Sequence, residues 1–252
     1  MHTWSGVRLN KRNKAETPAH AHPCIQVLCV TRGAINLVTD ERSCLVFPGF
    51  LVLIPARLRH RAWALGEVAG WSTYLPDGLR EADKVVVLRS SELLRAILQR
   101  VAAMGRLSRN KSDSCLKWLV QDELQRAGPF DPGVPFPVSP GLRLVANRIF
   151  AGTSMLAVRD CARLAAMSER NFSRKFKLEA GLSFERWRRR VLNEVALKLL
   201  LSGKRVAEVA EQTGFQTVSA FIASFRARFG ASPLKVLAQT SDPKHSREPL
   251  GD

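Results

Sequence analysis

The C-terminal half of this chain contains one pattern of aromatic and small residues twice. Its first copy recurs 49 residues later, as Phe172, Phe176, Gly181 and Ser183 followed by Phe221, Phe225, Gly230 and Ser232. Two Phe side chains four positions apart lie on one face of a helix and can anchor that face to a core, which leaves the opposite face free for a partner. The repeat therefore predicts two copies of a helix, a turn and a second helix.

A weaker repeat precedes each Phe pair. Ala162-x-Leu164-Ala165 recurs as Ala207-x-Val209-Ala210, which predicts four extra residues in the second copy, around Thr213-Gly214-Phe215. A helix over residues 184 to 201 is expected to join the copies, with Ser183 as its N-cap and Ser202-Gly203 as its stop. At 1.5 Å per residue this helix would be about 27 Å long, so two recognition helices could lie about one DNA turn apart.

A stretch rich in proline and glycine divides the chain. Residues 128 to 141 contain five prolines and three glycines, a composition that suits neither a helix nor a central strand. We therefore expect an interdomain linker over 128–141 and a helical domain over 142–240. Residues 241–252 lack apolar periodicity and are expected to be disordered.

The residues before the linker show two patterns in succession. Up to Leu88, short apolar runs (IQVLCV, AINLV, SCLVF, FLVLI, KVVVL) alternate with turn residues such as Arg32-Gly33. These runs predict the strands of a small barrel or sandwich over 1–88. Over 89–127 the apolar residues follow helical spacing, which predicts two helices that pack on the barrel or form a dimer surface. The fold class predicted is α+β with two domains, the C-terminal one all-α.

The charge of the chain points to an acidic partner. It has 39 Lys and Arg against 22 Asp and Glu, a net charge of +17, and 18 of the basic residues but only 7 of the acidic ones lie between positions 142 and 240. Nucleic acid or an anionic membrane surface would suit this excess. No apolar run approaches the roughly 20 residues of a membrane-spanning helix. Because no signal peptide precedes the first domain, we expect a cytoplasmic protein.

Two segments of the C-terminal half resemble a known family. LAAMSERNFSRKFKLEAGLSFERW and VAEVAEQTGFQTVSAFIASFRARFGASP are similar to the double helix-turn-helix domain of AraC/XylS-type bacterial transcription regulators, in order and at the right separation, with Gly-Phe before the second recognition helix. The resemblance implies a homodimeric regulator, not an enzyme, that binds double-stranded promoter DNA and contacts RNA polymerase.

The resemblance also implies which residues contact DNA. In the two recognition helices the base-reading positions fall on Arg170, Ser173, Arg174, Val218, Ser219, Ile222 and Ala223. Arg can bond guanine in a bidentate manner, whereas short apolar side chains can only touch a thymine methyl group. The second motif, which departs from the polar residues of the family, is therefore expected to act mainly through phosphate contacts and DNA shape. Candidate phosphate contacts are Lys175, Lys177, Arg188, Arg189, Arg190, Arg226 and Arg228.

Members of this family carry a sensor domain ahead of the DNA-binding module, commonly a cupin-like barrel. His20-Ala21-His22 followed by Gln26, and Gly49-x5-Pro55-x4-His60, resemble the two cupin motifs. In cupins these positions supply three His and an acid to a divalent metal, but here Gln26 occupies the acid position. Trp63, Trp71 and Tyr74 are further candidates for lining a pocket.

Two interpretations of this motif stay open. In the first, His20, His22, Gln26 and His60 form a pocket for a small-molecule effector, and no cofactor is expected. In the second, His20, His22 and His60 hold zinc or another divalent metal, and Cys24 completes a tetrahedral site.

Two other functions compete with a regulator. One is a metal-dependent cupin oxygenase or isomerase with a basic helical appendage, against which Gln26 and the double motif both count. The other is a basic peripheral membrane protein, but the Phe pairs that such a protein would expose are assigned to a core.

Overall fold

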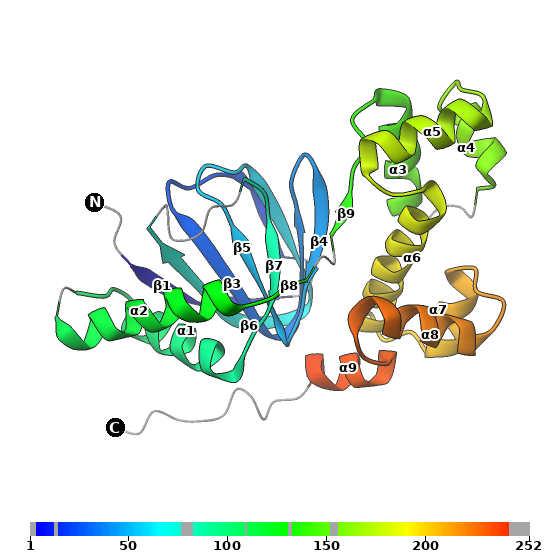
Figure 1. The fold of residues 1–252 in the computed structure, drawn as a ribbon. Coiled ribbons are helices and arrows are strands. Elements are labelled where there is room, and N and C mark those ends of the chain that lie inside the picture. The colour runs from blue at the N-terminus through cyan, green and yellow to red at the C-terminus, as the bar shows by residue number, and fades with distance from the viewer. Residues whose placement is uncertain are drawn as a thin grey trace. The chain divides into compact units, whose positions relative to one another are not determined.

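The structure, a computed structural model, describes residues 4–12, 15–76, 83–108, 110–130, 133–151 and 156–241. They form two compact units, one with residues up to 39, from 44 to 132 and from 238 onward, the other with residues 40–43 and 133–237. Figure 1 shows the strands and helices of the fold.

An antiparallel sheet forms most of the first unit. Its strands are β1 (Ser5–Lys11), β2 (Glu16–His20), β3 (Ile25–Val38), β4 (Arg42–Val46), β5 (Phe50–Ile54), β6 (His60–Leu75), β7 (Val86–Arg89) and β8 (Pro129–Phe130). They run in the order β1-β6-β3-β5-β7-β8, and β2 also pairs with β6. The runs IQVLCV and AINLV belong to one strand, β3, so the turn expected at Arg32-Gly33 was wrong. Gly33 has φ 69° and the register shifts on both sides of Arg32, which makes this point a β-bulge.

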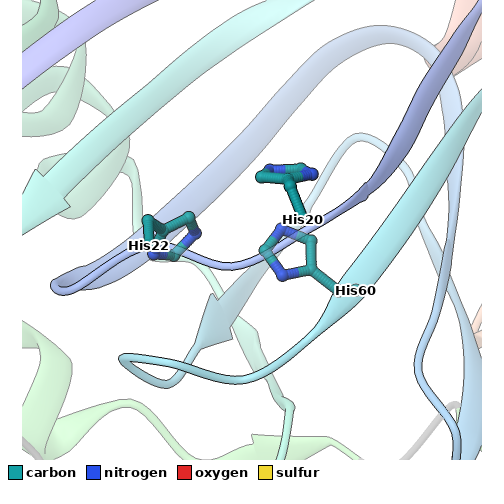
Figure 2. Close-up of side chains that lie close together, drawn as sticks. All are labelled: His20, His22 and His60. Carbon is teal, nitrogen blue, oxygen red and sulfur yellow. The ribbon is translucent and has the colours of Figure 1, made fainter.

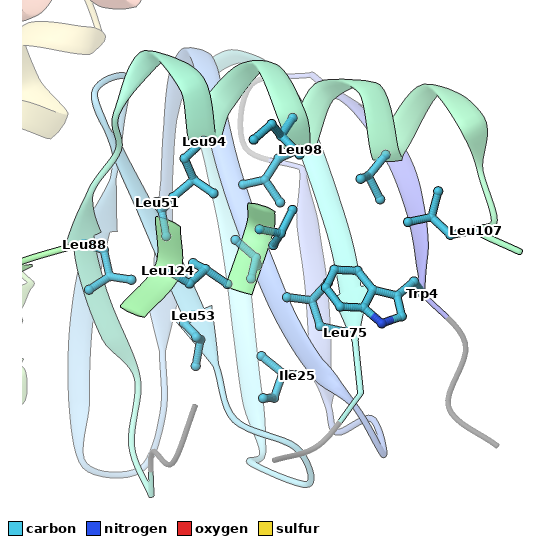
Figure 3. Packing of buried hydrophobic residues seen from close by; sticks show 14 residues of the cluster. Trp4, Ile25, Leu51, Leu53, Leu75, Leu88, Leu94, Leu98, Leu107 and Leu124 are labelled. Atoms are coloured by element: carbon cyan, nitrogen blue, oxygen red, sulfur yellow. The ribbon is translucent and has the colours of Figure 1, made fainter. Parts of the chain in front are cut away.

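Two helices cover one face of this sheet. They are α1 (Glu92–Met104) and α2 (Lys111–Arg126), capped by the side chains of Ser91 and Asn110. Figure 3 shows the core between sheet and helices, where Ile25 and Leu53 of the strands meet Leu94, Leu98 and Leu124 of the helices. Because side chains alternate along a strand, the residue after Ile25 points to the other face of the sheet.

The proline-rich stretch is more ordered than predicted. It contains β8 and β9 (Val134–Pro135), and α3 begins at Pro140. The expectation that 128–141 holds no helix was therefore wrong at its end, where Pro140 begins α3, because the first turn of a helix needs no N–H donor there. The two short strands agree with the expectation of no central strand, since β8 is the last strand in the sheet order and β9 pairs with β4 alone. Residues 131 and 132 lie outside the described residues.

The second unit is helical. Its helices are α3 (Pro140–Phe150), α4 (Val158–Leu164), α5 (Glu169–Ala180), α6 (Phe184–Leu201), α7 (Val206–Gln212), α8 (Val218–Phe229) and α9 (Pro233–Ser241). The helix predicted over 184–201 is confirmed, with Ser183 as N-cap and Ser202 as C-cap. Ser241, expected in a disordered tail, is the last residue of α9, and the rest of that predicted tail lies outside the described residues.

Within the part of the chain that the structure describes, no helix is both long enough and apolar enough to cross a bilayer.

Candidate nucleic-acid interface and ligand site

The two helix-turn-helix copies close their turns in the same way. In the first, the Met167 N–H donates to Ala162 O (2.9 Å); in the second, the Phe215 N–H donates to Ala210 O (2.9 Å). The residue before each donor, Ala166 or Gly214, has a left-handed φ of 55° or 73°. Each bond therefore ends α4 or α7 in an equivalent turn.

This equivalence corrects the alignment expected from the sequence. Ala162 corresponds to Ala210 and not to Ala207, so the second copy has one extra residue between its helices and not four. The physical reason is that a shift of three residues leaves side chains on the same helix face, so a short apolar pattern matches nearly as well one turn out of register.

Helix α5 presents a polar face opposite its Phe anchors. Phe172 and Phe176 are fully buried, whereas Arg170, Ser173 and Arg174 are exposed. A hydrogen bond of 3.1 Å from Arg174 Nη2 to Asn171 Oδ1 orients the guanidinium. Sequence reasoning missed Asn171, although its position three residues before Arg174 on one helix face was a signal for it.

Helix α8 has the same anchors and a different outer face. Phe221 and Phe225 are fully buried. Val218, Ser219 and Ala223 are exposed and Ile222 is half-buried. The turn before the helix contains a recess of about 380 Å³, lined by Ala207, Ala210, Glu211, Gly214, Phe215, Gln216, Thr217 and Val218. The outer face of α8 is therefore mainly apolar, whereas the outer face of α5 carries guanidinium groups.

The candidate phosphate contacts differ in their exposure. Lys177, Arg189 and Arg226 are exposed and free to reach an anionic backbone. Lys175 is half-buried, with its Nζ 3.9 Å from Glu179 Oε1.

Three other arginines are held by the protein itself. Arg188 donates to Leu156 O (2.9 Å) and Glu185 Oε2 (2.8 Å), and Arg190 donates to Gly133 O (3.2 Å). Arg228 has only 8% of its side chain exposed. These placements do not support phosphate contacts by Arg188, Arg190 and Arg228, because their charge and donors are used within the domain.

Arg228 belongs to a buried charge cluster that the sequence did not reveal. Its Nη2 lies 4.0 Å from Oε1 of Glu194, a residue with no exposed side-chain area. Burial raises the pKa of Glu194 to about 7, while nearby Lys198 and Arg228 oppose this shift. The signal available in the sequence was an acid on the apolar face of α6, between Val191 and Leu197. This cluster connects α6 to the second recognition helix.

The three histidines expected to act together lie together in the first unit. His20 in β2 is the cross-strand partner of His60 in β6, and their ring centroids are 4.3 Å apart. The His22 ring lies 5.1 Å from that of His60 and 6.0 Å from that of His20. Figure 2 shows the three rings gathered at this point. One nitrogen from each ring lies within 4.8 Å of the other two, so they can share a ligand.

Gln26 joins this cluster from the neighbouring strand. Its Oε1 lies 2.9 Å from His22 Nε2, and its Nε2 donates to Ser72 Oγ (2.6 Å) and Tyr74 Oη (3.4 Å). Gln26 and Tyr74 face each other in the register of β3 and β6. The structure thus brings together all four residues predicted for the pocket and adds Ser72, which sequence reasoning missed because strand pairing alone brings it there.

The other candidates lie apart from this contact set. Cys24 is outside the cluster of potential metal ligands, and only its backbone carbonyl engages His22, at 2.7 Å from Nδ1. Trp63 lies beneath the Arg61 guanidinium at 4.7 Å.

Burial lowers the pKa of His60, which favours its neutral, ligand-binding form.

Comparisons with known proteins match both parts of the chain. Residues 7–115 match the model of the AraC-like ligand binding domain, and residues 161–239 match that of a helix-turn-helix domain. The HTH-type transcriptional regulator NimR of Escherichia coli K12 is 26% identical over 228 residues, which cover 88% of this chain and 83% of NimR.

Matches among solved structures were also found. ToxT from Vibrio cholerae is 12% identical with a TM-score of 0.41, over 95% of this chain and 100% of that one. The C-terminal domain of AraT from Geobacillus stearothermophilus is 28% identical with a TM-score of 0.36, over 45% of this chain and 93% of that one.

Proposed function

We propose, from the premise that this chain belongs to the AraC-type transcriptional regulators, how its two units divide sensing from DNA recognition. The ligand-binding domain takes up a small-molecule effector and the helix-turn-helix domain binds DNA. The observation that carries the second role is the pair of Phe-anchored helices α5 and α8, each with an exposed outer face. We assign base reading to Arg170, Ser173 and Arg174 in α5, and to Val218, Ser219, Ile222 and Ala223 in α8.

DNA selection tests this role. Fragments of the source genome that the full chain retains would define an operator, and its affinity would then be measured against salt concentration. Lys177, Arg189 and Arg226 are exposed, and with about three more contacts the logarithm of affinity should fall with that of salt at a slope of about −5. An affinity independent of salt would contradict the proposal.

The effector site proposed is the polar cluster of His20, His22, Gln26 and His60. His60 and Gln26 are buried and His20 and His22 are half-buried, so a ligand that reaches this cluster meets several hydrogen-bonding groups at once, which suits a polar molecule. By linkage, the effector and the operator must change each other's affinity by the same factor. A His22→Ala, His60→Ala double variant should bind the operator but lose the response to the inducing compound, for which the gene beside the operator suggests candidates. A normal response would move the effector site elsewhere.

We further propose a homodimer formed through α2. Trp118 on this helix is 62% exposed, a large apolar area for a monomer surface. Sedimentation should show a dimer at micromolar concentration that Trp118→Ala weakens. Leu178→Ala, which removes a side chain 78% exposed on α5, is the control and should leave the dimer intact.

Three expectations from the sequence stay predictions. They are a contact with RNA polymerase, a cytoplasmic location and the lack of enzymatic activity.

A further inference from the structure

Gln216 is the one extra residue of the second helix-turn-helix copy. In both copies a backbone N–H closes the turn, that of Met167 in the first and that of Phe215 in the second. In the first copy the next residue, Ser168, is already the N-cap of α5. In the second copy Gln216 lies between Phe215 and the N-cap of α8, which is Thr217. Gln216 therefore has no counterpart in the first copy.

The side chain of this extra residue is available to a partner. Gln216 is exposed, and together with Thr217 and Val218 it lines the recess of about 380 Å³ in the turn before α8. Within the part of the chain that the structure describes, no residue forms a hydrogen bond with its amide. Residues at the N-terminal end of a recognition helix are those that reach base edges in the major groove of DNA. Gln216 therefore lies where a base contact is expected.

The other side chains at this end of α8 offer weaker discrimination between bases. The chain reads QTVSAFIA from Gln216 to Ala223, and the glutamine is its only side chain with a donor group and an acceptor group in one plane. The Thr217 hydroxyl oxygen is used within the helix, because it accepts from the Ala220 N–H at 3.1 Å. Ser219 carries a single hydroxyl, which can bond to several bases. Gln216 is thus the one residue of this segment that can select a base through two hydrogen bonds.

We propose that Gln216 is a specificity-determining residue that binds one adenine in the half-site of α8. Its N–H donates to adenine N7 and its carbonyl oxygen accepts from the N6 amino group, a pair of groups that no other single base presents in the major groove. Val218, two residues further on, is exposed and supplies an apolar contact for a thymine methyl group. The second motif thus combines an amide for adenine with an apolar side chain for thymine. This inference rests on the DNA-binding role proposed above.

Selection of DNA from a randomised pool by the full chain tests the proposal. The wild-type chain should select adenine at one position that Gln216→Ala no longer selects, and this variant should bind the selected site about 5- to 150-fold more weakly. Gln216→Glu should change the preferred base there from adenine to cytosine, because a carboxylate accepts from the cytosine N4 amino group. Gln212→Ala, the matched control, removes an exposed glutamine at the end of α7 outside the recess and should change neither profile nor affinity. An adenine preference that survives in Gln216→Ala at every position would overturn the proposal.

A base analogue gives a second measurement that does not depend on variants folding. Replacing the selected adenine by 7-deazaadenine removes the N7 acceptor, so the affinity of the wild-type chain should fall about 2- to 12-fold, as expected for the loss of one hydrogen bond. The same replacement should make no difference to Gln216→Ala, and equal binding of both DNAs by the wild-type chain would overturn the contact. The two proposals fail in different ways: specific DNA binding with unchanged preferences in Gln216→Ala refutes only the role of Gln216, whereas a wild-type chain that selects no DNA refutes the DNA-binding role and this inference with it.

Discussion

Helices α5 and α8 have the same scaffold and different outer faces. Each is anchored by two fully buried Phe side chains and ended by a left-handed glycine, Gly181 or Gly230. Arg170 and Arg174 are exposed on α5, whereas Val218, Ala220 and Ala223 are exposed on the first two turns of α8. The difference teaches that the core of a helix-turn-helix specifies its geometry, while the residues between the anchors are free to specify a different DNA sequence.

The largest effect is expected from the two arginines near the end of α8. Arg228→Ala should lower the free energy of unfolding by about 3 kcal/mol, because it leaves Glu194 buried beside one cation fewer. Arg226→Ala removes an exposed charge from the same turn and should leave stability within about 0.5 kcal/mol while it weakens DNA binding. Chemical denaturation measures both, and equal losses of stability would show that the buried cluster does not support α8.

The buried acid should also make stability depend on pH. Its pKa is raised from 4.5 to about 7 in the folded chain, so the folded state binds the proton more tightly than the unfolded state does. The contribution of Glu194 to the free energy of unfolding should therefore be highest below pH 4.5 and should fall as pH rises towards 7. Above pH 7 it should stay level, and the whole change should be at most about 3 kcal/mol. Glu194→Gln should flatten this part of the profile in denaturation measured from pH 5 to pH 8; an unchanged profile would assign the dependence to other groups.

A smaller effect, on specificity, is expected in α5. Arg174→Ala should cost about 1 to 3 kcal/mol of operator affinity and relax the preference at one base pair, because it removes a bidentate donor. Lys177→Ala, on the same helix and also exposed, should weaken all sequences alike. Binding profiles over randomised sites distinguish the two, and a specificity profile unchanged by Arg174→Ala would remove this residue from the base-reading set.

Helix α8 should instead read a methyl group. Replacing thymine by uracil in its half-site should lower affinity about fourfold, the equivalent of about 0.8 kcal/mol for one buried methyl group. In Val218→Ala the same replacement should make little difference, because the side chain that contacts the methyl group is shortened. If the wild-type chain binds both DNAs equally, α8 contributes through phosphates and DNA shape alone.

An effect of similar size is expected from the two turns. Ala166 has φ 55° where the equivalent Gly214 has φ 73°. A left-handed Ala is strained, so Ala166→Gly should stabilise the chain by about 0.5 kcal/mol and Gly214→Ala should destabilise it by about 1 kcal/mol. Thermal unfolding should show shifts of opposite sign, and shifts of the same sign would mean that the turns are not equivalent.

The sequence by itself determined the parts of this protein that depend on neighbours along the chain. Helix faces, N-caps and left-handed glycine stops act over three to five residues, so the Phe anchors, Ser183 and the bounds of α6 could all be predicted. The resemblance of two short motifs to those of cupins also predicted that His20, His22, Gln26 and His60 lie in one site, and the structure brings the four side chains together.

Only the tertiary structure decided which charged residues are available to a partner. Arg226 and Arg228 are two residues apart in one helix, yet the first is exposed and the second lies against Glu194. Likewise Ser72 reaches Gln26 across 46 positions of sequence, and Arg32-Gly33 forms a bulge because β6 pairs with both halves of β3. Burial and cross-strand contact arise from packing between distant segments, and a pattern of neighbouring residues does not contain that information.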